Sequence, residues 1–459
     1  MKTIVQLIFL FLVSFTVSGQ DITGEWSGSF RQVTFVFHIE KKENNYVSTM
    51  DLPDRNLMGI QTKSTTFQNG SLHIDGTNFG FEYKGEFRNN NNVIEGKFME
   101  GVNAIPLDLK REKIVLAQRP NRPQEPVKPY PYYEEEVFFE NKEDGITLAG
   151  TLTLLDKNGS YPAVILITGS GPQNRDEEIF GHKPFLVLAD HLTRQGIAVL
   201  RYDDRGVNKS TGVFADATTS DFATDVLSAV KYLESRTEID NRNIGLIGHS
   251  EGGIIAPMAA NQSEDIAFII LLAGTGIPGS EVSAIQARTL RSFDVPDEDA
   301  YEQYVRQAIA IASTDKDVAE VRKELKDFYQ NSSMLKGLLP AGVDRDVFIN
   351  DLVNTRTTPW IRYFYTYNPA NELEKVTCPV LSLNGSNDVQ VPAEINQAAI
   401  RKALEKGGNT DFLVKEFPGL NHFFQESKTG LLNEYATIEQ TISPVVLEEI
   451  ADWIRKHIR

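Results

Sequence analysis

The sequence predicts two domains: a small all-β domain, followed by an α/β domain with a mostly parallel eight-stranded sheet and a helical insertion. Three observations predict this division. Residues 20–116 alternate apolar and polar side chains at period two, with frequent turn signals. Residues 117–133 are rich in proline. In residues 134–459, short apolar runs alternate with amphipathic helical segments, which is typical of an α/β sheet.

The first residues predict a secretory signal peptide at 1–19. A charged start is followed by an apolar run over residues 4–15 and then by small residues, with Val17 and Gly19 placed as a cleavage site requires. The run is shorter than the roughly 20 residues that a membrane-spanning helix needs. We therefore expect a mature protein that has no membrane span and is secreted or periplasmic, with a retained membrane anchor as the alternative.

Residues 20–116 predict a small β-barrel or β-sandwich. Val33, Phe35 and Phe37 point to one face of a strand, and the pattern glycine-x-aromatic recurs, as at Gly24-Glu25-Trp26 and Gly96-Lys97-Phe98. Short strands at this spacing favour a meander that closes on itself. The segment carries neither a nucleophile constellation nor a metal-ligand cluster. It could bind a ligand, dock on the next domain or only add solubility, and docking is the favoured interpretation.

Residues 117–133 predict a stiff linker and the boundary between the domains. Proline fixes φ and lacks an N–H group, so a cluster of prolines cannot continue a helix or a central strand. The prolines of this cluster are Pro120, Pro123, Pro126, Pro129 and Pro131.

The α/β domain is predicted from its apolar runs and from one long interval without them. Parallel strands that are buried on both faces read as short apolar runs. The candidate strands are residues 136–140, 147–154, 163–168, 198–202, 244–247, 267–272, 380–384 and 412–417. Residues of about 277–375 show helical periodicity without a strand, which predicts a helical cap over the carboxyl edge of the sheet.

The fifth run leads into Gly248-His249-Ser250-Glu251-Gly252, a Gly-x-Ser-x-Gly motif, and then into an apolar stretch with Pro257 in or near the first turn of a helix. A strand, this motif and a helix in succession are the context of a nucleophile elbow. Such an elbow exposes the serine above the end of the strand. Ser250 is therefore the candidate nucleophile, and an ordinary glycine-rich turn is the alternative.

Two titratable residues follow later strands in the order that this architecture requires. Asp388 comes shortly after the run 380–384, and His422 follows the run 412–417. The order serine, acid, histidine is that of the catalytic triad on this type of sheet. His457 is the only other histidine after Ser250, and it lies near the end of the terminal helix among basic residues, where we expect it to be solvated. The sequence therefore predicts Ser250, Asp388 and His422 as the catalytic residues.

Each member of this set has a chemical task. Imidazole accepts the serine proton, and a carboxylate orients the ring. The developing oxyanion needs backbone N–H donors, for which we expect Glu251 and, in the loop after the third strand, Ser170, with Gly171 as the second choice. The Glu251 side chain could tune the site or bind an amine, but a structural hydrogen bond is the expected role. His249 is expected to serve packing.

Composition excludes several other functions. The formal net charge of -17 argues against a nucleic-acid or anionic-membrane partner. Cys378 is the only cysteine, so an intramolecular disulfide is impossible and a buried inert thiol is expected. The sequence contains neither a metal-ligand cluster nor a dinucleotide fingerprint, and we expect no metal and no cofactor. Asp203 and Asp204 are rivals for the catalytic acid, but they precede Ser250 and fit a structural turn.

From about Glu134 to Arg459 the chain resembles bacterial α/β-hydrolase carboxylesterases that carry a Gly-His-Ser-Glu-Gly-Gly elbow. The segments that carry the resemblance are Gly169–Pro172, Arg175–Glu177, Gly181–Phe185, Arg201–Val207, Gly248–Gly253, Leu383–Asp388 with Val391-Pro392, and Pro418–His422. The resemblance implies an α/β-hydrolase fold, a helical cap and an acyl-serine mechanism with the triad named above. Asn208 stands where the family usually has glycine, which should alter only a turn remote from the triad.

These observations together predict a serine hydrolase that cleaves carboxylic esters of small molecules. An enclosed pocket under the cap favours small or short acyl groups. A serine peptidase or aminopeptidase on the same fold is the alternative, and a non-catalytic binding protein is a third reading that an intact triad disfavours. The sequence leaves the particular ester and the oligomeric state open.

Overall fold

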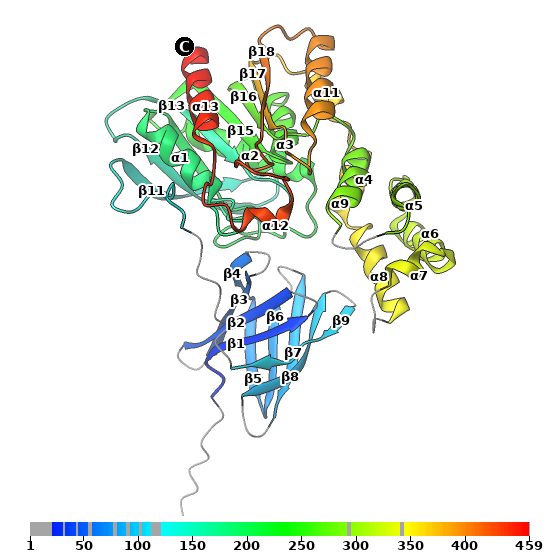
Figure 1. Ribbon diagram of the computed structural model, residues 1–459. Coiled ribbons are helices and arrows are strands. Elements are labelled where there is room, and N and C mark those ends of the chain that lie inside the picture. The colour runs from blue at the N-terminus through cyan, green and yellow to red at the C-terminus, as the bar shows by residue number, and fades with distance from the viewer. Residues whose placement is uncertain are drawn as a thin grey trace, which may run out of the picture.

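The computed structural model describes residues 21–30, 33–42, 45–53, 57–76, 80–88, 92–100, 103–111, 121–291, 295–339 and 344–458. The predicted signal peptide, residues 1–19, and the first residues of the predicted linker lie outside these ranges. The described chain forms a β-barrel and, beyond the connecting segment, an α/β domain with a helical extension (Figure 1). Within the described ranges, no helix has the length and apolar character that crossing a membrane requires.

The first domain is a closed antiparallel barrel. Its strand order is β10-β1-β2-β3-β5-β6-β7-β8-β9, with β4 paired to β3, and β10 pairs with both β1 and β8, which closes the sheet. The sequence prediction of a barrel or a sandwich is confirmed in the form of the barrel. The described strands are β1 (Gly24–Phe30), β2 (Val33–Lys42), β3 (Asn45–Leu52), β4 (Leu57–Gln61), β5 (Ser64–Gln68), β6 (Ser71–Gly76), β7 (Phe81–Phe87), β8 (Val93–Glu100), β9 (Asn103–Pro106) and β10 (Leu109–Lys110).

The barrel interior is filled by the apolar half of the period-two pattern. Trp26, Phe37 and Tyr83 are fully buried in one cluster with the inward side chains of the other strands. The Tyr83 hydroxyl donates to the carbonyl oxygens of Ile94 and Leu107, at 3.2 and 3.1 Å. Strand alternation therefore explains the core of this domain, because successive side chains point to opposite faces.

The second domain contains the predicted eight-stranded sheet, in the order β11-β12-β14-β13-β15-β16-β17-β18. The first two pairings, β11 with β12 and β12 with β14, are antiparallel, and the remaining pairings are parallel. This topology confirms the predicted α/β-hydrolase fold. The strands are β11 (Tyr133–Asn141), β12 (Ile146–Leu154), β13 (Tyr161–Ile167), β14 (Ala198–Tyr202), β15 (Ile239–His249), β16 (Ile266–Leu272), β17 (Val380–Gly385) and β18 (Phe412–Phe417).

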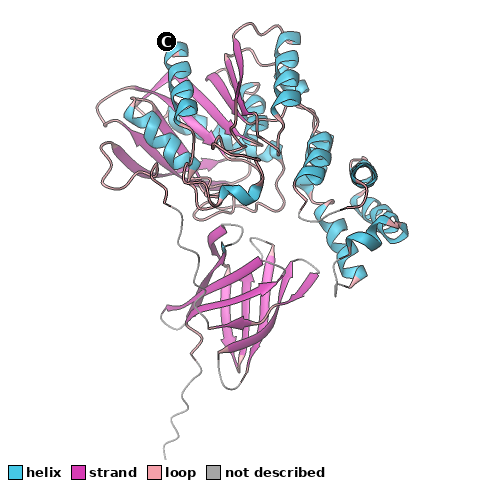
Figure 2. Cartoon of the chain, in the orientation of Figure 1, coloured by secondary structure: helices cyan, strands magenta, loops and turns pink. Residues whose placement is uncertain are grey.

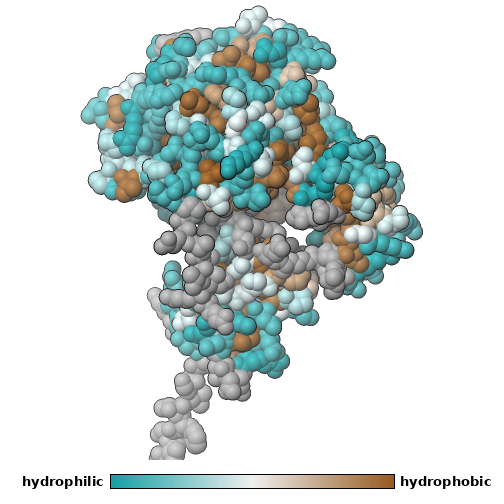
Figure 3. All heavy atoms as spheres, viewed as in Figure 1, coloured by the Kyte–Doolittle hydropathy of each residue, from teal (hydrophilic) through white to brown (hydrophobic). Residues whose placement is uncertain are grey.

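Helices cover both faces of this sheet, and each face has its own apolar core (Figures 1 and 2). On one face, α1 (Pro184–Arg194) and α13 (Pro444–His457) bury residues such as Leu188 and Trp453 against the strands. On the other, α2 (Thr219–Glu234), α3 (Gly252–Ala260) and α11 (Ala393–Lys406) bury residues such as Val226 and Ile400. The space-filling view shows a mostly hydrophilic surface with small apolar patches (Figure 3).

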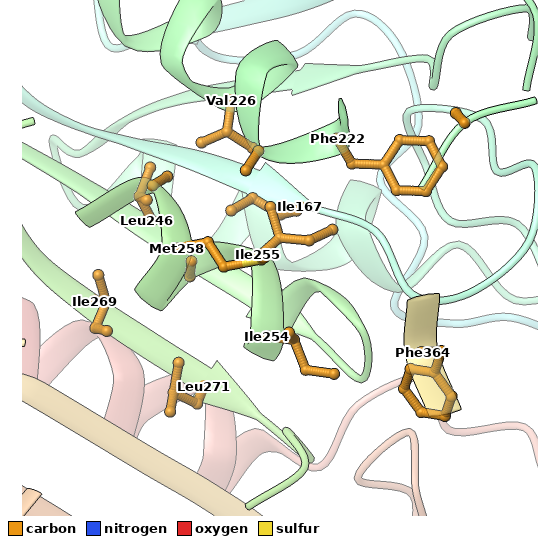
Figure 4. Close-up of a cluster of buried hydrophobic side chains, with 14 of the residues drawn as sticks. Ile167, Phe222, Val226, Leu246, Ile254, Ile255, Met258, Ile269, Leu271 and Phe364 are labelled. Carbon is orange, nitrogen blue, oxygen red and sulfur yellow. The ribbon is translucent and has the colours of Figure 1, made fainter. Parts of the chain in front are cut away.

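Helix α3 lies deep in the second of these cores. Its Ile254, Ile255 and Met258 pack with residues of β15 and α2 (Figure 4). The helix begins at Gly252, two residues after Ser250, so Pro257 lies in its second turn, next to the first turn, in or near which the sequence placed it.

The interval between β16 and β17 consists of helices in the described residues. They are α4 (Gly279–Thr289), α5 (Glu298–Ala312), α6 (Val318–Asn331), α7 (Met334–Leu338), α8 (Arg345–Thr355), α9 (Pro359–Thr366) and α10 (Ala370–Leu373). This is the predicted helical insertion. Its helix α9 returns toward the sheet, so that Phe364 lies near Ile254 of α3 (Figure 4). A short helix, α12 (Leu432–Tyr435), precedes α13.

Candidate active site

Ser250 stands at the tip of β15 in a strained turn. Its φ of 53° lies in the left-handed region, which is costly for a residue other than glycine. The Ser250 N–H donates to the carbonyl oxygen of Leu272 at 2.8 Å, and the Ser250 carbonyl accepts from the N–H of Gly253 at 3.0 Å. Neighbouring structure therefore holds the strained backbone in place.

The glycines around Ser250 are required by close backbone approach. A Cβ at Gly248 would lie 1.9 Å from the carbonyl oxygen of Gly252, and a Cβ at Gly253 would lie 2.7 Å from the Cα of Gly274. Real side chains essentially never come so near. Gly248 of the Gly-x-Ser-x-Gly motif and the neighbouring Gly253 are thus explained by the tight passage from β15 to α3.

Asp388 and His422 are joined by a hydrogen bond. His422 Nδ1 donates to Asp388 Oδ2 at 2.7 Å, and both residues are 4% exposed. The other carboxylate oxygen, Oδ1, accepts from the N–H groups of Gln390 and Val391, each at 2.8 Å. These bonds fix the carboxylate, which in turn leaves Nε2 of His422 as the ring nitrogen available for proton transfer.

A cavity of about 360 Å³ contains both Ser250 and His422 in its lining. Within the described chain, no hydrogen bond joins the Ser250 hydroxyl to His422. The structure therefore brings Asp388 and His422 together and places Ser250 in the same cavity. Catalytic hydrogen bonds are often long or unformed without substrate and tighten when it binds.

The two expected oxyanion donors also belong to this cavity. Ser170 and Glu251 both line it. Their backbone N–H groups donate to no acceptor elsewhere in the described residues, in contrast to the N–H of Gly169, which donates to Glu177 Oε1 at 2.8 Å. Two free N–H groups beside a nucleophile are suited to stabilise a developing negative charge.

The Glu251 carboxylate is a buried hub beside the nucleophile. Its Oε1 accepts from the hydroxyl of Thr219 and from the indole N–H of Trp360, each at 2.7 Å, and the Ser170 hydroxyl bonds the same carboxylate. Burial raises the pKa of Glu251, and these three donors offset part of that rise. The side chain thus links the elbow to α2 and to the cap, and the amine-binding role left open by the sequence is disfavoured.

His249 does more than the packing expected of it. Its Nδ1 lies 2.8 Å from Glu177 Oε1, and its Nε2 donates to the carbonyl oxygen of His422 at 3.1 Å. Burial by itself would lower the pKa of His249. The charge of Glu177, its hydrogen bond and the bond to the His422 carbonyl outweigh this effect, so the pKa of His249 is raised. Sequence reasoning missed this Glu177–His249 pair, because only the fold brings the two segments together.

Asp203 and Asp204 take structural roles, as expected. Asp204 accepts from the Thr168 hydroxyl at 2.7 Å and from the Gln173 N–H at 2.8 Å, so it braces the loop that carries Ser170. Burial raises the pKa of Asp204 well above its usual range. Asp203 pairs with the Arg175 guanidinium at 2.6 Å.

Asn208 adopts a φ of 47°, the left-handed conformation that glycine would supply at this turn. Asparagine is one of the few other residues that tolerate it. Its Nδ2 donates to Asp203 Oδ1 at 3.2 Å. The departure from the family pattern is therefore accommodated within this turn.

The cavity walls are aromatic and carry two acids and two histidines. Phe180, Trp360, Phe364 and Phe423 line it, together with polar groups such as Gln390. Among the described lining residues, Glu177 and Glu251 are the acids, and there is neither a lysine nor an arginine. Such a cavity suits an uncharged organic group better than an anion.

A metal site is not evident in the described ranges, where no cluster of three or more histidine, cysteine or acidic residues has suitable geometry. Cys378 is partly buried, and burial raises the pKa of its thiol to about 11, which makes the thiol a poor nucleophile at neutral pH.

Comparisons with known proteins place the α/β domain among hydrolases. The sequence profile of the X-Pro dipeptidyl-peptidase (S15) family matches residues 125–404. Esterase EstD of Thermotoga maritima is 27% identical over 330 residues, which cover 71% of this chain and 70% of that protein. An uncharacterized 31.7 kDa protein of Escherichia coli, from the traX-finO intergenic region, is 26% identical over 322 residues, which cover 69% of this chain and 97% of that protein.

Solved structures also match. The α/β hydrolase GrgF of Penicillium sp. sh18 has a TM-score of 0.44 and 17% identity, and the match covers 71% of this chain and 99% of GrgF. Est1E of Butyrivibrio proteoclasticus, in a structure with bound ferulic acid, has a TM-score of 0.42 and 19% identity, and the match covers 70% and 98% of the two chains.

Proposed function

The chain belongs to the X-Pro dipeptidyl-peptidase (S15) family, and on that premise we propose that it is a serine hydrolase which cleaves carboxylic esters through an acyl-serine intermediate. Family membership confirms the sequence prediction of an α/β-hydrolase enzyme, and the esterase relative supports the ester specificity. The observation that carries the proposal is a serine in a strained elbow, which shares one cavity with a histidine bonded to a buried carboxylate.

The proposed mechanism follows from which atoms are free. Ser250 Oγ attacks the acyl carbon while Nε2 of His422 takes its proton, because Nδ1 is already committed to Asp388. The N–H groups of Ser170 and Glu251 stabilise the oxyanion, and such a donor is worth roughly 3–4 kcal/mol of barrier. His422 then returns the proton to the leaving alcohol. Water, activated by the same imidazole, hydrolyses the acyl-enzyme.

The cavity supports a short, uncharged acyl group. Its volume of about 360 Å³ lies at the lower end of the range typical of small-molecule sites. Glu177 and Glu251 are the acids that line the cavity, and its two histidines are already paired with Glu177 and Asp388, so an anionic acyl group would be buried without a free cationic partner.

A panel of 4-nitrophenyl esters tests this proposal. We expect acetate and butyrate to be hydrolysed well, long-chain esters poorly, and the hemisuccinate at least about tenfold more slowly than butyrate, which corresponds to 1.4 kcal/mol. Ser250→Ala is the blank. Turnover of long-chain esters alone would contradict the size argument, and hydrolysis of none of the esters would contradict the proposed function.

A peptidase acting on proline-containing peptides is the second candidate, because the matching family is named for that activity. Its substrate would present a free amine, which would need a carboxylate of the cavity lining as its partner. The Glu251 carboxylate is already engaged by Thr219, Trp360 and Ser170, however, which weakens this reading. Dipeptidyl 4-nitroanilides with proline next to the scissile bond distinguish the two: turnover of these amides above that of the esters would favour the peptidase.

We also propose that the mature enzyme is secreted or periplasmic. The support is the sequence of residues 1–19, with its apolar run and small-residue cleavage site. Amino-terminal sequencing of the protein from its native host tests this, with a start at Gln20 as the expected result. Retention of the first residues would contradict cleavage.

A further inference from the structure

The segment between the two domains, residues 121–132, does more than separate them. The sequence predicts it as a stiff spacer. In the structure, the side chains of Arg122 and Gln124 bind backbone groups of the α/β domain, and Tyr132 is buried. This segment is therefore built into the surface of the α/β domain.

The Arg122 guanidinium donates to four backbone carbonyl groups. Nε donates to Gly181 at 2.9 Å, Nη2 donates to Phe180 at 3.1 Å and Ala436 at 3.0 Å, and Nη1 donates to Ile438. A guanidinium presents five N–H groups in a fixed planar fork, so it can bridge two chain segments at once. Arg122 thus ties together two loops that are far apart in the sequence.

Gln124 holds the second of these loops as well. Its Oε1 accepts from the N–H groups of Thr441 at 2.6 Å and Ile442 at 3.2 Å, and its Nε2 donates to the Ile442 carbonyl at 2.7 Å. The His182 Nδ1 lies 3.0 Å from the Thr441 hydroxyl. Residues 436–442 are consequently fixed from the connecting segment and from the loop before α1.

The segment 436–442 supports the turn that carries His422. Gln425 Nε2 donates to the carbonyl oxygen of Gln440 at 3.0 Å, and the Ser443 N–H donates to the carbonyl oxygen of Phe424 at 2.8 Å. These bonds join Gln440, and Ser443 directly after the segment, to residues only two and three positions after His422. A displacement of 436–442 would therefore move the imidazole.

The other loop held by Arg122 forms a wall of the cavity. Phe180 lines the cavity together with Ser250, and its ring packs edge-on against Tyr435 at 5.2 Å. Tyr435 in turn contacts Phe423, the neighbour of His422, with ring centroids 5.7 Å apart. The Arg122 guanidinium therefore binds both the loop that forms this cavity wall and the segment that supports the turn of His422.

We propose that Arg122 is a positioning residue for catalysis. From the segment between the domains, it holds the loop of Phe180 and residues 436–442, which support His422, in fixed positions relative to each other. The inference rests on the proposed function, since it assigns His422 as the base. Arg122 does not line the cavity, so it acts through the placement of other groups.

The test uses the full chain with Arg122→Ala and Arg122→Lys, and Arg242→Ala as the matched control. Arg242 has a 75% exposed side chain that pairs with Asp240 on the surface. Two rates are measured: hydrolysis of 4-nitrophenyl butyrate, separated into kcat and KM, and covalent labelling of Ser250 by a fluorophosphonate. Circular dichroism checks the fold of each variant.

We expect Arg122→Ala to lower kcat and the labelling rate about 10- to 100-fold while KM changes less than about threefold, because misplacement of a catalytic group by about 1 Å costs up to 100-fold. Arg122→Lys should recover only part of this loss, since an ammonium lacks the planar fork. Arg242→Ala should match the wild type.

Wild-type kcat and labelling rate in a folded Arg122→Ala variant would overturn the proposal. If the alanine variant does not fold, the lysine variant decides in the same way, with a wild-type kcat overturning the proposal and a reduced kcat supporting it. A wild-type protein that is labelled at Ser250 but hydrolyses no ester would refute the proposed ester activity alone, and the labelling rates would still test Arg122.

Discussion

Substitution of Gly252 by alanine tests the geometry of the elbow most directly. Gly252 begins α3, and a Cβ at this position would lie 2.3 Å from the carbonyl oxygen of Ile167 and 2.9 Å from that of Thr168. Carbon and carbonyl oxygen ordinarily approach no closer than about 3.3 Å. Either α3 or the end of β13 must therefore move by about 1 Å.

The size of the effect follows from what that movement displaces. Overpacking of a well-packed core typically costs about 1–3 kcal/mol of unfolding free energy. The end of β13 leads directly into the loop of Ser170, whose N–H is a proposed oxyanion donor. A shift of about 1 Å there should lower kcat by up to about 100-fold.

Urea unfolding and ester kinetics on the same preparation measure both quantities. Gly337→Ala in α7 is the matched control, because a Cβ there meets no atom within 4 Å. In a helix this change should stabilise the protein by roughly 0.5–1 kcal/mol and leave kcat unchanged. A Gly252→Ala variant with wild-type kcat and stability would refute the assignment of this turn as a tightly packed elbow.

Three further predictions follow from buried polar groups. Trp360→Phe removes a donor to the Glu251 carboxylate, so urea unfolding should show a loss of about 1.5–3 kcal/mol, and unchanged stability would contradict the hub role. Burial lowers the pKa of His182 to about 4 from 6.5, so the unfolded chain binds more protons than the folded chain between these pH values. The contribution of neutral His182 to the free energy of unfolding is fully present above pH 6.5 and should fall by up to about 3 kcal/mol toward pH 4. His182→Gln should show a weaker pH dependence of unfolding in urea. The pKa of His249 is raised, so its effect on stability runs the other way. Its contribution to the free energy of unfolding is fully present below pH 6.5 and is lost as the pH rises through the raised pKa. Urea unfolding across this range should show that Glu177→Gln removes this loss at alkaline pH.

Much of the fold and of the candidate site was predictable because it depends on local patterns. The central strands of the sheet contain short apolar runs, and the elbow is encoded in the glycines around Ser250, which backbone proximity demands. The acid and the histidine follow strands β17 and β18, and the carboxyl ends of parallel strands meet at one edge of a sheet. Sequence order alone therefore indicated that Asp388 and His422 would be neighbours.

Other features were decided only by the tertiary structure. The choice between barrel and sandwich depends on one short strand, β10, which pairs with both β1 and β8. Three interactions join segments that are far apart in the chain. They are the Glu177–His249 pair, the hydrogen bond from Trp360 to Glu251, and the hydrogen bonds from Arg122 to four backbone carbonyl groups. A buried charged or polar group needs a hydrogen-bond partner. The periodicity and spacing of the sequence do not predict which distant residue will be that partner. The sequence by itself determined the strands, the glycine-rich turn and the order of the three candidate catalytic residues; the folded chain decided which side chains hold that candidate site in place.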